Sequence, residues 1–221
     1  MKKLKLVIFS VLLPILVFSQ NQTDFRGMFS INLEKKITQR LSITAMANGI
    51  LTYDFQELGF AFYDGGVRYK ISKIFSTNAN YRFMQRLNLE NFYDDRHLLY
   101  GDIDFSKNIG KWAIGGTARF QTQFFSAFSD SYHYPLAYNR SKINLKYKVN
   151  YYWHPFAEIE LFTPLNHPTR KNVDQVRASL GFHYTFNDYL NVEFFAQIRQ
   201  QINRAPRNTI FLTAVNWYVK F

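Results

Sequence analysis

Apolar and polar residues alternate along most of this chain with a period of two. In one segment, Phe25, Phe29 and Ile31 share a face, while Ser30 and Asn32 share the other. Such alternation is typical of β-strands that present one apolar and one polar side. Eleven segments follow this pattern, at residues 25–34, 41–51, 61–71, 75–83, 99–105, 112–124, 140–149, 157–161, 175–184, 190–199 and 211–221.

The last segment ends on an aromatic carboxyl terminus, Phe221, and its apolar face also carries Trp217 and Val219. This ending is typical of the final strand of a bacterial outer-membrane barrel, where the assembly machinery recognises it. We therefore interpret Trp217, Val219 and Phe221 as an assembly signal, with the barrel assembly machinery as the partner.

The amino terminus has the features of a secretory leader. Basic residues at Lys2, Lys3 and Lys5 flank an apolar run that ends at Phe18. That run is about 15 residues long, and a membrane-spanning helix needs roughly 20. The sequence predicts a signal peptide at 1–19, cleaved after Ser19, and a barrel domain at 20–221.

The composition favours a membrane barrel over a soluble domain. Aromatic residues make up 19% of the chain, with 23 Phe and 15 Tyr, yet the mean hydropathy is negative. A barrel with an apolar lipid face, a polar lumen and aromatic girdles reconciles the two. The chain has no cysteine, so no disulfide contributes. We expect an all-β, transmembrane, antiparallel up-and-down barrel of about 10–12 strands in the outer membrane, and a soluble periplasmic sandwich or lectin fits less well.

The connections between the segments alternate in length. Short turns are expected at 35–39, 72–74, 107–111, 150–155 and 186–189, and longer loops at 54–60, 87–95, 126–139, 163–172 and 202–208. Short periplasmic turns and longer outer loops are the usual asymmetry of such barrels. Because single-chain bacterial barrels have even strand numbers, eleven segments imply ten or twelve strands, or a first segment that is not an ordinary wall strand.

The charge is strongly positive, at +11 for the whole chain. The leader carries three lysines and no acid, so +8 remains after cleavage. Lys and Arg at the rims that face anionic lipopolysaccharide explain this excess, and an anion-attracting lumen is the alternative. No nucleic-acid motif accompanies the charge.

Charged residues on the polar faces are the candidate functional residues. They form a proposed lumen charge network of Arg82, Arg119, Arg140, Lys142, Glu158, Glu160, Arg177, Glu193 and Arg199. Because isolated buried charges are costly, these groups either pair as a plug that stiffens the barrel or select a small solute. We expect Glu158 and Glu160 to lie across from Arg140 and Arg177 on neighbouring strands.

Catalytic alternatives have weaker support. Asp95, His97, Asp102 and Asp104 are similar to the paired residues of omptin proteases, but His97 falls on the lipid face. Ser179 and His183 share an inward face, yet four residues along a strand separate them by about 13 Å, which is too far for a dyad. No metal-binding spacing or phosphate loop occurs, and we expect no cofactor.

Two aromatic groups stand out. Phe124, Phe125, Phe128, Tyr132, Tyr134 and Tyr138 surround the longest expected outer loop, where they form a belt or a sugar-stacking surface. Trp112, Tyr151, Tyr152, Trp153, Trp217 and Tyr218 are interpreted as the periplasmic girdle.

Several short motifs resemble the predicted outer-membrane barrels of Bacteroidetes known as domain of unknown function 2490. They are Gly65-Gly66-Val67-Arg68-Tyr69, Asn80-Tyr81-Arg82, Arg96-His97, Ala118-Arg119-Phe120, Arg140-Ser141-Lys142, Pro155-Phe156-Ala157-Glu158 and Val176-Arg177-Ala178-Ser179-Leu180-Gly181. The resemblance implies a barrel and no established activity. We expect a narrow or plugged pore for a small anionic solute, with a structural or accessory protein, or a lipid- or sugar-modifying enzyme, as alternatives.

Overall fold

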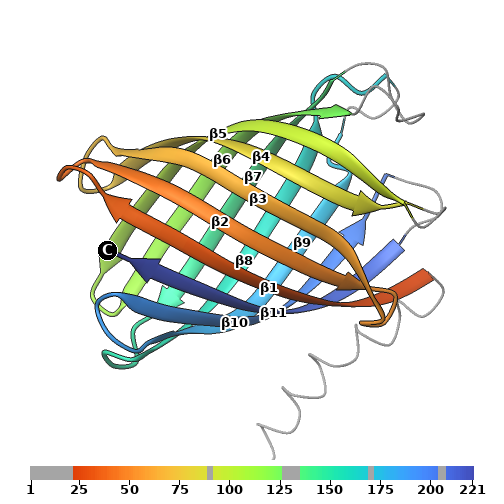
Figure 1. Ribbon diagram of the computed structural model, residues 1–221. Helices are drawn as coiled ribbons and strands as arrows, with labels where there is room; N and C mark the ends of the chain where they lie inside the picture. The colour runs from red at the N-terminus through yellow and green to blue at the C-terminus, as the bar shows by residue number, and fades with distance from the viewer. Residues whose placement is uncertain (1–21, 89–91, 126–134, 169–171, 204–207) are drawn as a thin grey trace, which may run out of the picture.

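The computed structural model describes residues 22–88, 92–125, 135–168, 172–203 and 208–221 and shows a closed β-barrel (Figure 1). The predicted signal peptide at 1–19 lies outside these residues. The strands are β1 (Gln22–Lys36), β2 (Leu41–Thr52), β3 (Glu57–Lys70), β4 (Phe75–Leu87), β5 (Tyr93–Ile109), β6 (Trp112–Phe125), β7 (Leu136–Tyr147), β8 (Trp153–Pro164), β9 (Gln175–Thr185), β10 (Leu190–Gln201) and β11 (Asn208–Lys220). The all-β barrel prediction is confirmed.

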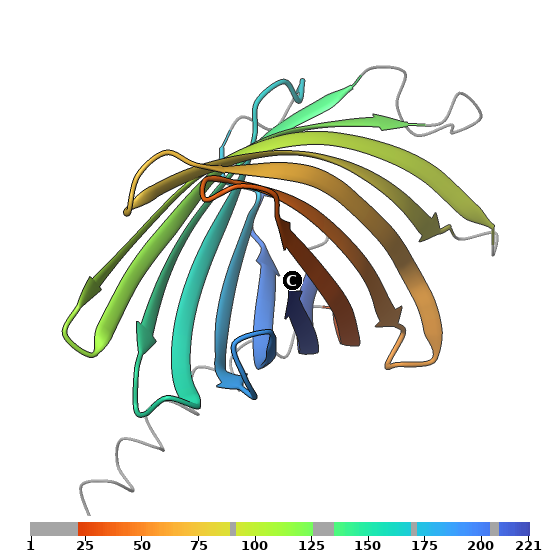
Figure 2. The ribbon, with the colours of Figure 1, turned by 60° about the vertical axis from the view of Figure 1, so that its left-hand side comes forward.

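The barrel has eleven strands, which is within the expected range of about 10–12, whereas the inference that their number is even is wrong. Every strand pairs antiparallel with its neighbours in sequence, but β1 and β11 pair in parallel, with Phe29 opposite Val215. Their arrowheads point to the same end in Figure 1, and the two strands lie side by side again in Figure 2. All eleven segments predicted from the alternation are wall strands, and the parallel pair is what allows an odd number to close.

The alternation sorts side chains between the outside and the inside of the barrel. On β1, Phe29 and Ile31 are 53% and 51% exposed, whereas Ser30 between them is 2% exposed. Ile143, Ile159 and Leu180 continue the apolar outer surface on other strands. Apolar side chains outside and polar ones inside are the reverse of a soluble barrel and suit a lipid environment. None of the described residues forms a helix long and apolar enough to cross a membrane.

Four of the five short turns share one hydrogen-bonding device. In the β9–β10 turn, the Asn187 side chain accepts hydrogen bonds from the amides of Tyr189 and Leu190, at 2.9 and 2.8 Å. Thr38, Ser72 and Asn150 do the same in the β1–β2, β3–β4 and β7–β8 turns. Such side chains replace backbone partners in tight turns. The fifth turn, between β5 and β6, uses Gly110 at φ 60°, which suits a two-residue hairpin.

The aromatic girdle at the short-turn end is largely as expected. Trp153 packs against Tyr184 and Phe182, with ring centroids 4.9 and 5.0 Å apart, and Trp112 packs on Tyr147 at 4.7 Å. Tyr218 is the exception, because it faces the lumen and its hydroxyl lies 3.4 Å from Glu193 Oε1. Its position on the polar face of the last strand already favoured the inside.

At the opposite end, the β2–β3 turn is tied to the start of β1. The amide of Phe25 donates to Asp54, and the amide of Tyr53 donates to Asp24, both at 3.1 Å. Tyr53, Asp54 and Phe55 all have positive φ, which costs energy for residues other than glycine. These two carboxylates hold the strained turn against the first strand.

Candidate functional site

A cavity of about 1410 Å³ lies inside the barrel. Its walls include Asp24 and Asp54 near the long-loop end and Glu34 and Lys220 near the short-turn end. The side chains between them are the inward members of the alternating strands. The lumen is therefore the candidate functional site.

One side of this lumen carries paired charges. Arg82 lies directly across from Asp64, and its Nε and Nη2 donate to the two carboxylate oxygens at 2.6 and 2.7 Å. The Tyr100 hydroxyl donates to the same carboxylate. Arg119 holds Asp102 with the same geometry and the same distances. Such two-pronged pairs are strong and fix the plane of the guanidinium.

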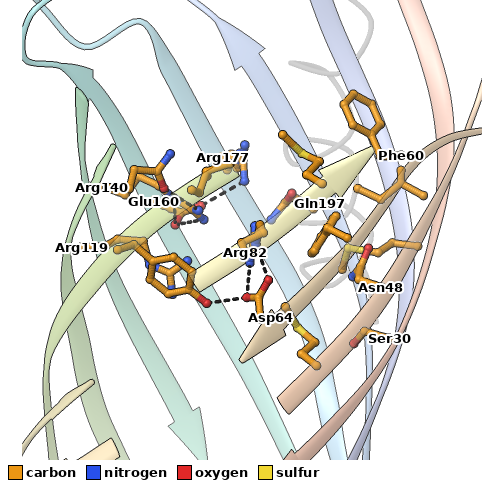
Figure 3. Close-up of a pocket in the computed structure, with 18 of the residues that line it drawn as sticks. Ser30, Asn48, Phe60, Asp64, Arg82, Arg119, Arg140, Glu160, Arg177 and Gln197 are labelled. Carbon is orange, nitrogen blue, oxygen red and sulfur yellow. Dashed lines mark hydrogen bonds and ion pairs between the residues drawn. The ribbon is translucent and has the colours of Figure 1, made fainter. Parts of the chain in front are cut away.

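A third carboxylate serves two arginines. Glu160 Oε1 accepts from Arg140 Nη2 at 2.7 Å, and its Oε2 lies 3.4 Å from Arg177 Nη1 (Figure 3). Glu160 lies between the two arginine-bearing strands, as predicted from the sequence. Glu158 does not share this role, because it faces Asn144 and Ser179 across the strands and pairs with Lys142 at 3.3 Å.

The guanidinium groups of these arginines lie over the faces of aromatic rings. The Arg177 and Arg140 guanidinium carbons lie 3.8 and 4.4 Å from the Phe162 ring centroid. Arg119 lies 3.9 Å from the centroid of Tyr100. Ring faces attract cations and hold guanidinium groups in place without neutralising them.

The positive groups exceed the negative ones. Eleven Lys or Arg line the cavity against eight Asp or Glu, a surplus of three. Arg199 stands directly opposite Arg177 on the neighbouring strand, and its Nε donates to Gln197. In the described part of the chain, neither Arg199 nor Arg96 forms an ion pair. Like charges at directly opposed positions of a sheet repel each other, so the pair of Arg177 and Arg199 is expected to destabilise the fold.

A second polar cluster lies beside the parallel strand pair. His183 Nε2 is 2.7 Å from Glu193 Oε2, and Asn216 donates to the other oxygen of Glu193 at 2.9 Å. Ser30 of β1 donates to Asn216 at 2.7 Å. This chain of contacts joins β9, β10, β11 and β1 on the lumen side and places Glu193 away from the arginine cluster.

All nine candidate residues lie on the inner face of the barrel, and eight of them line the cavity. The sequence reasoning omitted three partners from the network, namely Asp64, Asp102 and Tyr100, although the alternation had placed each of them on a polar face. Arg96, which the predicted network does not contain, also faces the lumen.

The described residues do not form the contacts that the catalytic alternatives require. His97 accepts or donates a 2.6 Å hydrogen bond with the Tyr81 hydroxyl on the outer surface, away from Asp102. Ser179 receives a hydrogen bond from Gln197 at 2.8 Å, not from His183. Among the residues with described positions, no group of three or more possible metal ligands occurs.

The aromatic residues expected around the longest outer loop do not all lie on the same face of the barrel. Phe128, Tyr132 and Tyr134 lie outside the described residues. Phe124 is exposed on the outer face, while Phe125 and Tyr138 line the lumen, where Arg96 lies 5.1 Å from the Phe125 ring centroid. Of the three aromatics with described positions, two face the cavity.

Comparison with known proteins identifies the fold. A family described as "Protein of unknown function (DUF2490)" matches residues 25–210. The chain is similar to the NanC porin structure, with a TM-score of 0.50 and 9% identity over 80% of this chain and 87% of that chain. It is more distantly similar to OmpT, an outer membrane protein of Vibrio cholerae, with a TM-score of 0.37 and 11% identity over 75% and 77% of the two chains. No curated protein matches the sequence. The similarity to the NanC porin structure supports the fold described above, a β-barrel of the porin type.

Proposed function

The chain belongs to the DUF2490 family of proteins of unknown function, and we propose that it forms a narrow outer-membrane channel for a small anionic solute. The observation that carries the proposal is the surplus of positive side chains along a cavity with walls from both ends of the barrel. Rings of cationic side chains favour anions in pores. Arg177 and Arg199 face each other, and only Arg177 has an ion-pair partner in the described part of the chain, so we place the centre of selectivity at these two residues.

Conductance in planar bilayers tests the proposal. The purified barrel is expected to give discrete current steps, and a chloride gradient should give a reversal potential of the sign for anion selectivity. Arg177→Gln and Arg199→Gln should each move that reversal potential toward zero, because each removes one positive charge from the lumen. Arg40→Gln is the matched control, since Arg40 lies exposed in the β1–β2 turn outside the lumen.

Two results would contradict the channel. A folded barrel without current would mean that the ion pairs plug the lumen, and a structural or accessory role would then be preferred. Cation selectivity in the wild type, or a reversal potential unchanged by both lumen variants, would remove the role of the arginines.

We also propose the partners that membrane insertion requires. Trp217 and Phe221 are exposed on the outer face at the end of the last strand, which supports the assembly-signal role of Trp217, Val219 and Phe221. The remaining positive residues at the rims suit the phosphates of lipopolysaccharide. Export by the 1–19 signal peptide belongs to the same proposal.

A further inference from the structure

The lumen has an apolar side that a water-filled channel does not need. Ile50, Phe62, Leu212 and Ala214 form a buried cluster inside the barrel, with relative exposures of 6%, 8%, 1% and 4%. Met28, Met46, Met84, Phe60 and Phe195 pack against it. We call those of them that line the cavity the apolar strip: Met28, Met46, Ile50, Phe60, Phe62, Met84 and Phe195.

The strand register makes the strip continuous. Phe195 lies opposite Ala214, Ala214 opposite Met28, Met28 opposite Ile50, and Ile50 opposite Phe60. The row therefore crosses four strand pairs, including the parallel one. All of these residues except Ala214 line the cavity. Lumens of porins are polar, so apolar side chains on four strands of this lumen point to something other than water.

Arginines border the strip at its end on β4 and β5. Phe60 lies opposite Arg86, and Met84 lies opposite Arg96 in the adjacent row. The Arg82 guanidinium carbon is 4.3 Å from the Phe62 ring centroid. Across the cavity, Arg140, Glu160 and Arg177 face the side that carries Phe60 (Figure 3). One space is thus walled by fixed cations on one side and by apolar groups on the other.

We propose that the lumen binds an amphiphilic organic anion, with a sulfonate, carboxylate or phosphate group near the arginines and an aromatic or aliphatic body on the apolar strip. This rests on the proposed function and specifies its solute class. Methionine is flexible and polarisable, and surfaces rich in it adapt to varied apolar partners. Three of the four methionines of the chain, Met28, Met46 and Met84, lie on this strip.

The space is large enough for such a ligand. Pockets for small organic molecules usually have volumes of about 300–1000 Å³, and this cavity has about 1410 Å³. A strip that served only as a packed core would have its partly buried side chains covered, whereas Met28, Met46 and Met84 all line the open cavity.

A pair of probe anions with equal charge tests the proposal. Naphthalene-2-sulfonate carries an apolar body, and methanesulfonate has almost none. Binding of each would be measured by ligand-observed NMR on the barrel in lipid nanodiscs, with empty nanodiscs as the background. The same anions would be added to single channels in planar bilayers. Naphthalene-2-sulfonate should bind at least about tenfold more tightly and should block the current at lower concentration.

Substitutions on the strip give the decisive comparison. Met28→Gln with Met84→Gln keeps side-chain length and makes the strip polar, so binding of naphthalene-2-sulfonate should weaken about tenfold while methanesulfonate is unaffected. Met28→Leu with Met84→Leu is the matched control and should retain binding. Heat-modifiable migration on a denaturing gel checks that each variant is folded.

The outcomes separate the two proposals. Equal binding of both anions, or full naphthalene-2-sulfonate binding in a folded Gln variant, overturns the amphiphilic ligand and leaves an anion channel intact. Binding of naphthalene-2-sulfonate without any current overturns the channel and keeps the binding site. If the Met28→Gln, Met84→Gln double variant does not fold, the single substitution Met84→Gln is tested instead. It is also expected to weaken the binding of naphthalene-2-sulfonate.

Discussion

Among single residues, Glu160 is the carboxylate on which the charged side of the lumen depends most. It balances Arg140 and Arg177, and Arg177 already faces Arg199. Removing one partner of a buried ion pair leaves an uncompensated charge, which usually costs about 3–5 kcal/mol. Here water in the lumen lowers that cost, and three arginines would share it.

We therefore expect Glu160→Gln to lower the free energy of unfolding by about 3 kcal/mol, measured by urea titration of the barrel in lipid vesicles. Glu34→Gln is the control, because its contact with Arg68 is 3.8 Å long and partly exposed and should be worth less than about 1 kcal/mol. Equal effects of the two substitutions would contradict a special role of Glu160.

The opposite sign is expected at Arg199. Since Arg199 faces Arg177 and has no described carboxylate as an ion-pair partner, Arg199→Gln should raise the free energy of unfolding while it reduces anion selectivity. The same urea titration and the reversal potential measure the two effects on one protein. A loss of stability would mean that Arg199 is part of a structural plug.

The sequence predicts whether a side chain points into or out of the barrel, but it does not predict which side chain it contacts. A period of two fixes whether Asp64 or Arg119 points inward, because successive side chains alternate between the two sides. Pairing also needs the offset between strands, and a shift of two residues keeps the face while it changes every partner. For that reason the expected pairing of two glutamates with Arg140 and Arg177 holds for Glu160, whereas Glu158 pairs with Lys142.

At the scale of elements, the hairpin turns could be predicted from the sequence, but the parallel pairing of β1 with β11 could not. The turns repeat an apolar residue followed by Thr, Ser or Asn, as in Ile37-Thr38, Ile71-Ser72 and Phe186-Asn187, and these polar side chains cap the turn amides. β1 and β11 are joined by no turn, so no local pattern states whether they pair in parallel. The rule of even strand numbers misled on this point.

Cysteine cross-linking tests the parallel pair in a chain that has no cysteine of its own. Phe29→Cys with Val215→Cys should form a disulfide on mild oxidation, because the two positions are direct partners on the lipid side. The disulfide would be detected on a denaturing gel as a difference in migration between samples run with and without reductant. Heated and unheated samples would both be compared in this way. Phe29→Cys with Phe211→Cys is the control, since four residues along a strand separate position 211 from the correct partner by about 13 Å. Cross-linking of the control pair alone would contradict the register.

For the whole molecule, the odd strand number separates the two ends of the described chain. β1 begins at the end of the barrel that carries the longer connections, while β11 ends at the end with the short turns (Figure 1). Short turns usually face the periplasm, which would place the start of β1 at the cell surface. An even-stranded barrel would instead bring both ends to the periplasm.

An epitope inserted immediately before Gln22 should therefore be accessible to antibody on intact cells. An epitope between Asn187 and Asp188, in the β9–β10 turn, should become accessible only after the outer membrane is permeabilised. An epitope in the segment that joins β6 and β7 is the surface control. If the insertion before Gln22 were protected in intact cells while the surface control was labelled, the first strand would have to run in the other direction, and the parallel closure with Asn208–Lys220 would be wrong. Labelling before Gln22 together with protection at Asn187 requires an odd number of membrane crossings between the two sites, in agreement with the nine strands β1–β9.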